Sequence, residues 1–276
     1  MTLDGDLTHV ATVQSWECDS NGHLNVQFFH QRFREAGAHY RMRHGLSGTP
    51  MVSAHTRFHR ELYADDMARV FTLPVRGADG AVYLMHRLTA DGRSLSCSTL
   101  DRLTGDAAGL SPRPLSEFPE VAPRGLPAGP GTPLAATEPL IASGRALVSC
   151  ITHVLPSDLD HTGAWRAERL LSSFSNGGQL AWSLIGAEPH WLRERGLGRV
   201  VLEMKLDCLR SPAAGAVLRQ TSHALELGTK TYRFAHQIED AISGECLAVG
   251  EVVSILLDHA SRKSVAFPPD LAIAGG

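Results

Sequence analysis

The chain has 276 residues, of which 43% are hydrophobic and 20% are charged, and its formal net charge is -3 at pH 7. This length suits one large domain or two small ones, and the composition is that of a globular protein, which excludes disordered, collagen-like and coiled-coil chains. The slightly acidic balance argues against a dedicated nucleic-acid-binding protein, because such proteins concentrate Lys and Arg to neutralise phosphates.

The cysteines and the N-terminal residues bear on the cellular compartment. Five cysteines are scattered without a CxxC pair, which indicates reduced thiols rather than a disulfide framework or a zinc knuckle. The first residues include acidic side chains and lack the apolar core of a signal peptide, and no stretch reaches the roughly 18 apolar residues of a membrane span. We therefore expect a soluble cytoplasmic protein with neither nucleic acid nor membrane as a partner.

The 14 histidines raise the question of a metal site. The sequence has no HExxH motif and no cluster of Cys and His ligands. His55 and His59 are four residues apart in a strand-like segment, where this spacing does not bring two side chains together as it does on a helix. We expect neither a metal nor a cofactor.

In chain order, the first half of the sequence predicts a strand, a loop, a long helix and four strands. Apolar residues at i, i+3 and i+4 spacing predict the helix over residues 24–44, which Gly45 ends. Turn signals separate four strand-like stretches, at residues 51–62, 67–77, 81–90 and 93–103.

A proline-rich segment follows. Eight of the 15 prolines fall within residues 105–141, which also hold many glycines. Such a composition does not allow long helices or ladder strands, so we interpret the segment as a linker between a domain at 1–104 and a domain at 142–276.

The second half repeats the order of the first. A helix is predicted over residues 165–185, ended by Gly186, and four strands follow it, at residues 199–210, 216–227, 230–239 and 245–257. Because His86 and His236 are 150 residues apart, whereas the helices repeat at 141, we expect about nine additional residues between the second helix and its fourth strand.

Identical residues at a constant spacing of 141 link the two halves. The pairs are Val13 and Val154, Asp19 and Asp160, Gly22 and Gly163, Phe33 and Phe174, Gly37 and Gly178, and Gly45 and Gly186. This pattern predicts a duplication, with one helix against a curved antiparallel sheet in each half, an α+β arrangement. Gly37 and Gly178 lie mid-helix and cost helix stability, so we expect another element to approach closely at both positions.

The loop before the first helix contains the residues best suited to chemistry. Asp19 precedes Gly22 by three residues, close to a helix start whose N–H groups can hold an oxyanion. A substrate carbonyl against the N–H of Gly22 or His23 would be polarised, and Asp19 could deprotonate a water or attack the carbonyl itself. The alternatives are that Asp19 only caps the helix, that His23 only fills space, and that Asn25 only holds the loop.

The segment Asp19-Ser20-Asn21-Gly22-His23-Leu24-Asn25 resembles the D-x-x-G-H-x-N signature of the 4-hydroxybenzoyl-CoA thioesterase group of the hotdog superfamily. The resemblance implies a tandem double hotdog, each half a long central helix wrapped by a curved antiparallel sheet. It implies hydrolysis of an acyl-CoA or acyl-carrier thioester, with Asp19 as the essential acid, a backbone donor near Gly22 and His23, and His23 and Asn25 lining the site. It is also compatible with homo-oligomers of double-hotdog chains.

The segment from Pro156 to Trp165 looks like a diverged copy of this motif. It keeps Asp160 and Gly163, which makes Asp160 a second candidate acid, but Ala164 and Arg166 replace the His and Asn. We expect one complete site, in the first half, with Gly163 and Arg166 as candidate substrate-binding residues. Arg166 would hold a CoA phosphate or an acidic acyl group.

Four arginines of the first helix have two interpretations, contact with CoA phosphates or a solvated helix face. They are Arg32, Arg34, Arg41 and Arg43.

Two other functions stay open. A hotdog hydratase or dehydratase would share the fold and the acyl carrier, but its D-x-N-P-x-H signature is missing. A non-catalytic acyl-CoA-binding protein is the second, because a fold alone does not fix a function. The sequence does not identify the acyl group.

Overall fold

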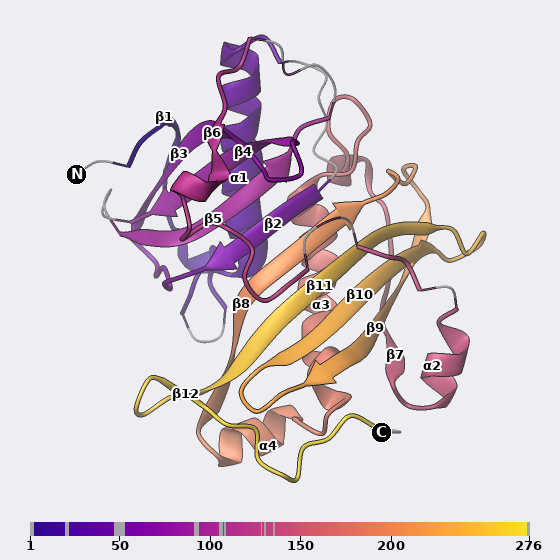
Figure 1. The fold of residues 1–276 in the computed structure, drawn as a ribbon. Helices are drawn as coiled ribbons and strands as arrows, with labels where there is room; N and C mark the ends of the chain where they lie inside the picture. Colours follow the sequence, from indigo (N-terminus) through magenta and orange to yellow (C-terminus); the bar gives the residue numbers. More distant parts are fainter. Residues whose placement is uncertain are drawn as a thin grey trace. The chain divides into compact units, whose positions relative to one another are not determined.

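A computed structural model describes residues 3–19, 22–46, 53–90, 94–104, 107, 109–127, 129, 131–134 and 136–274. The chain divides into two compact units, Met1–Arg124 and Gly125–Gly276 (Figure 1). Each unit is described by itself below.

The first unit is a curved antiparallel sheet with one long helix on a single face (Figure 1). Its elements are β1 (Asp6–Thr12), α1 (Val26–Arg43), β2 (Ser53–Phe58), β3 (Met67–Arg76), β4 (Val82–Thr89) and β5 (Leu95–Arg102). The strands lie in the order β1-β3-β4-β5-β2. The helix and four following strands match the order predicted from the sequence.

The second unit repeats this plan with additions. Its elements are α2 (Glu138–Ala142), β7 (Ala146–His153), α3 (Ala167–Ser183), α4 (Pro189–Glu194), β8 (Leu197–Cys208), β9 (Val217–Leu227), β10 (Tyr232–Asp240), β11 (Cys246–Asp258) and β12 (Lys263–Val265). The strands lie in the order β8-β11-β10-β9-β7, and β12 pairs with β11. The short helix α4 lies between α3 and β8, within the interval where the sequence predicted additional residues.

Corresponding aromatic stacks join helix and sheet in the two units. Phe33 of α1 stacks on His86 of β4, with ring centroids 6.0 Å apart, and Phe174 of α3 stacks on His236 of β10 at 5.0 Å. Each histidine is fully buried and forms a hydrogen-bonded pair with a hydroxyl group on the neighbouring strand, from Thr72 in one unit and Ser222 in the other. The two strand histidines are therefore packing residues of the core.

One mid-helix glycine differs from expectation. At Gly37 an added Cβ would lie 3.4 Å from Nε2 of His86, so the sheet does approach the helix closely there. At Gly178 it would meet no described atom within 4 Å. The close approach in the second unit is at Gly177, where a Cβ would collide with the side chains of Ser149 and Gln220. The expectation of a close approach at Gly178 is therefore wrong by one residue.

The described part of the predicted linker packs against both units. Arg113–Pro114 form strand β6 beside β3, and Phe118 and Val121 are buried on the face of the first sheet opposite α1. In the second unit, the backbone N–H groups of Gly125 and Gly131 donate to the carboxylates of Glu203 and Asp207. The described residues of the segment hold no long helix or strand, as its prolines predicted, but they are anchored rather than solvated.

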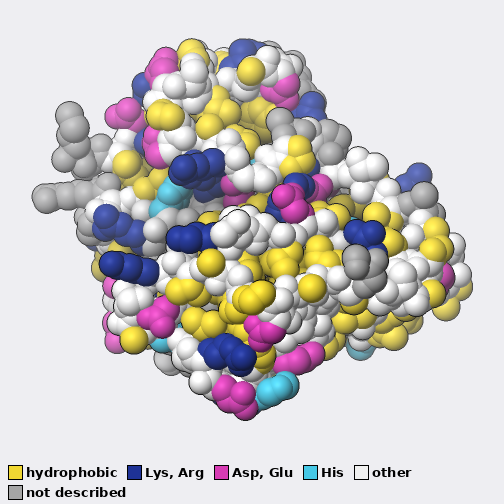
Figure 2. All heavy atoms as spheres, turned by 60° about the horizontal axis from the view of Figure 1, so that its bottom comes forward, with side chains coloured by type: hydrophobic (Ala, Val, Ile, Leu, Met, Phe, Trp, Pro, Cys, Tyr) yellow, Lys and Arg dark blue, Asp and Glu magenta, His cyan; other side chains and the backbone are white. Residues whose placement is uncertain are grey.

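No helix among the described residues is long and apolar enough to cross a membrane. On the face shown in Figure 2, basic and acidic side chains are interspersed with apolar ones.

Buried histidines predict a loss of stability in acid. Burial lowers the pKa of His236 to about 3, with a further contribution from His223, and burial lowers that of His30 to about 4. The unfolded chain, with a His pKa near 6.5, then binds more protons than the folded one between pH 6.5 and these lower values. Stability falls as pH falls through this window, by up to about 1.4 kcal/mol per pH unit for each histidine.

The free energy of unfolding, measured by urea titration at several pH values between pH 7 and pH 4, gives this slope. His236→Gln removes one titrating group and keeps a polar partner for Ser222, so its slope should be shallower than that of the wild-type protein. Equal slopes would show that His236 does not contribute to the acid sensitivity.

Candidate active site

A tight turn holds the Asp19 loop in the first unit. The backbone N–H of Asp19 donates to the carbonyl of His23 at 2.8 Å, and the N–H of Gly22 donates back to the carbonyl of Asp19 at 3.0 Å. Gly22 has φ 78°, and an added Cβ there would meet no described atom within 4 Å. Glycine is therefore needed for the left-handed backbone of this turn rather than for space.

The Asp19 side chain is exposed at the mouth of this turn. Its Oδ1 accepts a hydrogen bond from the His23 N–H at 3.1 Å. The two backbone donors expected to hold an oxyanion, those of Gly22 and His23, thus both bond to Asp19 in this structure. The arrangement presents a fixed, solvent-facing carboxylate.

Asn25, and not Asp19, caps the helix. The helix α1 starts at Val26, and Oδ1 of Asn25 accepts from the N–H of Gln27 at 3.2 Å. The N–H of Asn25 donates to the carbonyl of Glu17 at 2.9 Å. Asn25 therefore ties the Asp19 loop to the start of α1, and Asp19 has no part in capping.

Next to Asp19 the structure brings together a cluster that the sequence analysis missed. Nδ1 of His23 lies 3.4 Å from Oε1 of Glu61, and the Tyr63 hydroxyl donates to Oε2 of the same carboxylate at 3.0 Å. The rings of His23 and Tyr63 meet edge to face at 5.0 Å, and their backbones form a β-bridge. With Nδ1 facing a carboxylate, Nε2 is the ring nitrogen that can face a substrate.

A buried ion pair anchors the loop to α1. Nη1 and Nη2 of Arg32 lie 3.1 and 2.7 Å from the two carboxylate oxygens of Glu17, the last residue of a 3-10 turn (Ser15–Glu17) just before Asp19. The Arg32 and Glu17 side chains are only 3% and 10% exposed. Arg32 thus belongs neither to a solvated helix face nor to a CoA contact; both interpretations given above are wrong for this residue.

The second unit repeats the turn without the cluster. Oδ1 of Asp160 accepts from the hydroxyl and N–H of Thr162 at 2.6 and 2.8 Å and from the N–H of Ala164 at 3.0 Å. Burial acts to raise the pKa of Asp160, but these hydrogen bonds outweigh it and the pKa is lowered. Gly163, at φ 82°, donates to the Asp160 carbonyl as Gly22 does to Asp19.

Backbone pairing gives the counterparts of Glu61 and Tyr63. The N–H groups of His59 and Arg60 both donate to the carbonyl of Ser96, and those of Leu209 and Arg210 both donate to Leu247. Equivalent residues of the two units are therefore 150 positions apart in this part of the chain. Ser211 and Ala213 occupy the positions that correspond to Glu61 and Tyr63. Since Ala164 replaces His23, the cluster exists only in the first unit.

Arg166 takes the position of Asn25 but makes different contacts. Its Nη2 lies 2.6 Å from Oε1 of Glu168, and its Nη1 donates to the carbonyl of Ser157 at 2.8 Å. In this structure the side chain thus holds its own loop, next to the start of α3.

A comparison with protein families covers most of the chain. A family model described as "Thioesterase-like superfamily" matches residues 13–121 and 154–275, which are most of both units. The chain belongs to the thioesterase-like superfamily. No curated protein sequence matches it.

Solved structures resemble this thioesterase-like chain over most of its length. An acyl-ACP thioesterase from Bacteroides thetaiotaomicron VPI-5482 matches with a TM-score of 0.63 and 9% identity, over 89% of this chain and 96% of that one. A protein assigned as an oleoyl thioesterase from Lactobacillus plantarum gives 0.63 and 10%, over 90% and 94%. A 12:0-ACP thioesterase from Umbellularia californica gives 0.57 and 11%, over 89% and 92%. The predicted double-hotdog fold is confirmed.

Proposed function

We propose that the chain hydrolyses acyl thioesters at a single site in its first unit. The observation that carries the proposal is the cluster of His23, Glu61 and Tyr63 beside the exposed carboxylate of Asp19. The second unit keeps a carboxylate in an equivalent turn and replaces the rest of the cluster by Ala164, Ser211 and Ala213. Membership of the thioesterase-like superfamily supports the reaction class.

The site residues divide the chemical work between them. Asp19 takes a proton from water while the water oxygen attacks the thioester carbon, or attacks that carbon directly to give an anhydride that water then opens. The C–S bond breaks and the thiolate takes up a proton, so that the products are a carboxylic acid and a thiol. Nε2 of His23 faces the reacting group, and Glu61, whose Oε1 lies 3.4 Å from Nδ1, holds the ring in place.

The carrier is proposed as coenzyme A or an acyl carrier protein. Two of the similar structures are acyl-ACP thioesterases, and both carriers present the acyl group as a thioester of the same pantetheine arm. The family match and the Asp19 site fit either carrier.

Thiol release from a panel of acyl-CoA and acyl-carrier-protein thioesters tests the proposed function. Hydrolysis yields one thiol per acid formed. Addition of water to an enoyl-CoA without thiol release would instead show a hydratase, and tight binding without turnover would show a non-catalytic acyl-CoA-binding protein. Either result would overturn the thioesterase proposal.

A further inference from the structure

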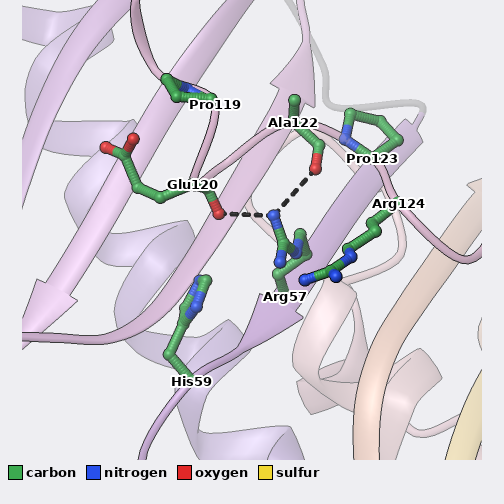
Figure 3. Close-up of a pocket in the computed structure, with 7 residues that line it drawn as sticks. All are labelled: Arg57, His59, Pro119, Glu120, Ala122, Pro123 and Arg124. Atoms are coloured by element: carbon green, nitrogen blue, oxygen red, sulfur yellow. Dashed lines mark hydrogen bonds between the residues drawn. The ribbon is translucent and has the colours of Figure 1, made fainter.

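A basic pocket lies in the first unit outside the Asp19 site. It has a volume of about 480 Å³ and is formed by the end of β2 and the segment that follows β6 (Figure 3). Arg57 and His59 line it from β2 and the residue after it, and Glu120, Ala122 and Arg124 line it from the covering segment. We call it the arginine pocket.

Arg57 is held in place without losing its charge. Its Nη1 donates to the backbone carbonyls of Glu120 and Ala122 at 2.6 and 3.0 Å. Both acceptors are neutral, and among the described residues no carboxylate lies within ion-pair distance of Arg57. Figure 3 shows the Glu120 carboxylate turned away from this guanidinium, toward which the Arg124 side chain points. Because its hydrogen-bond acceptors are neutral carbonyl groups, the Arg57 guanidinium keeps a positive charge that an anion in the pocket can pair with.

His59 adds a third polar group suited to an anion. Burial, together with the positive charge of Arg57, lowers the pKa of His59 to about 4, so its ring is neutral at pH 7. Nε2 lies 3.2 Å from the hydroxyl of Ser98. A neutral ring beside the Arg57 guanidinium supplies a hydrogen bond without adding like-charge repulsion, and a bound anion would raise the His59 pKa.

The chain connects the pocket to the Asp19 site over a short distance. Tyr63, which bridges to His23, is four residues beyond His59, and four residues span at most about 14 Å. A group bound in the arginine pocket would therefore lie within reach of a substrate arm that extends to His23.

We propose that the arginine pocket binds the phosphate of the phosphopantetheine arm that carries the acyl thioester, an inference that rests on the proposed function. Guanidinium groups bind phosphate oxygens with paired, charge-assisted hydrogen bonds. Coenzyme A and acyl carrier proteins both supply this phosphate, so the pocket recognises the chemistry that the two carriers share.

Arg124→Gln tests the proposal, because the Arg124 side chain is exposed and its loss leaves the Arg57 hydrogen bonds in place. The KM for acyl-phosphopantetheine and for acyl-CoA should rise about tenfold or more, with kcat unchanged, since a charged hydrogen bond contributes about 1.5–3 kcal/mol. The KM for acyl-pantetheine, which has no phosphate, should not change. Arg57→Lys keeps the positive charge but loses the paired hydrogen bonds of the guanidinium group. The KM for the phosphate-bearing substrates should rise less in this variant.

Arg76→Gln, an exposed arginine of β3, is the matched control for charge and should leave every KM unchanged. Comparison of acyl-CoA with an acyl carrier protein shows which carrier supplies the phosphate. An equal rise in KM for acyl-pantetheine would overturn the proposal, as would a rise confined to acyl-CoA, which would assign the pocket to the nucleotide end.

Direct binding separates this proposal from the proposed function. The His59 ring, observed by NMR, should titrate at a higher pH when phosphopantetheine is added and should not respond to pantetheine. This readout needs no turnover. An unmoved His59 titration overturns the phosphate site even if the protein is an active thioesterase, and a moved one supports the site even if hydrolysis fails.

Discussion

Asp19→Asn should lower thioester turnover by at least about a hundredfold, because general acid–base assistance by one side chain contributes about that much or more. The substitution removes the charge and keeps an oxygen that can accept from the His23 N–H, so the turn at Gly22 should persist. Steady-state thiol release, with the circular dichroism spectrum and melting temperature as checks on folding, measures the effect.

A variant with unchanged turnover would reduce Asp19 to a residue that closes the loop. If Asp19→Asn loses turnover because it unfolds, a second variant, Asp19→Glu, tests the chemical role instead. It keeps the charge, moves the carboxylate by one methylene, and should recover part of the activity if Asp19 acts chemically.

Arg32→Met should destabilise the first unit by about 3–5 kcal/mol, because it leaves the Glu17 carboxylate buried without its partner. The urea midpoint of that unit's transition should fall accordingly. A shift of less than about 1 kcal/mol would show that the pair is effectively solvated and worth no more than a surface ion pair.

The double variant Glu17→Gln with Arg32→Met is the matched control. It removes both charges, and replacement of a whole buried pair is often close to neutral, so it should regain most of the lost stability. If the double variant is as unstable as the single one, packing of the Arg32 side chain, rather than the unpaired charge, accounts for the loss.

The duplicated fold was predictable because it rests on local signals. Gly22 and Gly163 recur at one spacing, and both have the positive φ that makes glycine necessary in the turn. The helices were predicted two residues too early because apolar periodicity extends to Leu24, whereas α1 starts after its cap, Asn25. An N-cap stands just outside the helix, so periodicity alone cannot give its position.

The candidate site was predictable only in part, because some of its contacts depend on distant pairing. Glu61 and Tyr63 meet His23 through a β-bridge between segments about 40 residues apart, and no local pattern marks either residue. The one available signal was position, since Glu61 lies near the end of the strand-like stretch 51–62, just before a turn. Arg32 was misread for a similar reason, since its partner Glu17 precedes the helix.

The linker likewise combines a property that is predictable from local sequence with contacts that are not. Its prolines correctly predicted that the described residues hold no long helix or strand. Its contacts with Glu203 and Asp207, however, are made by backbone N–H groups, which every residue type except proline has. Such anchoring depends on which buried carboxylates the sheet presents, and this becomes visible only in three dimensions.

A comparison of Asp19→Asn with Asp160→Asn on one acyl thioester tests the central claim most directly. The claim is that the working site lies in the first unit. Because the Asp160 turn lacks the counterparts of His23, Glu61 and Tyr63, Asp160→Asn should keep turnover within about threefold of the wild-type protein while Asp19→Asn loses at least about a hundredfold. Abolished turnover in Asp160→Asn, with Asp19→Asn only mildly affected, would place the working site in the second unit. Equal losses would mean two sites or one built jointly, and either result would contradict the claim.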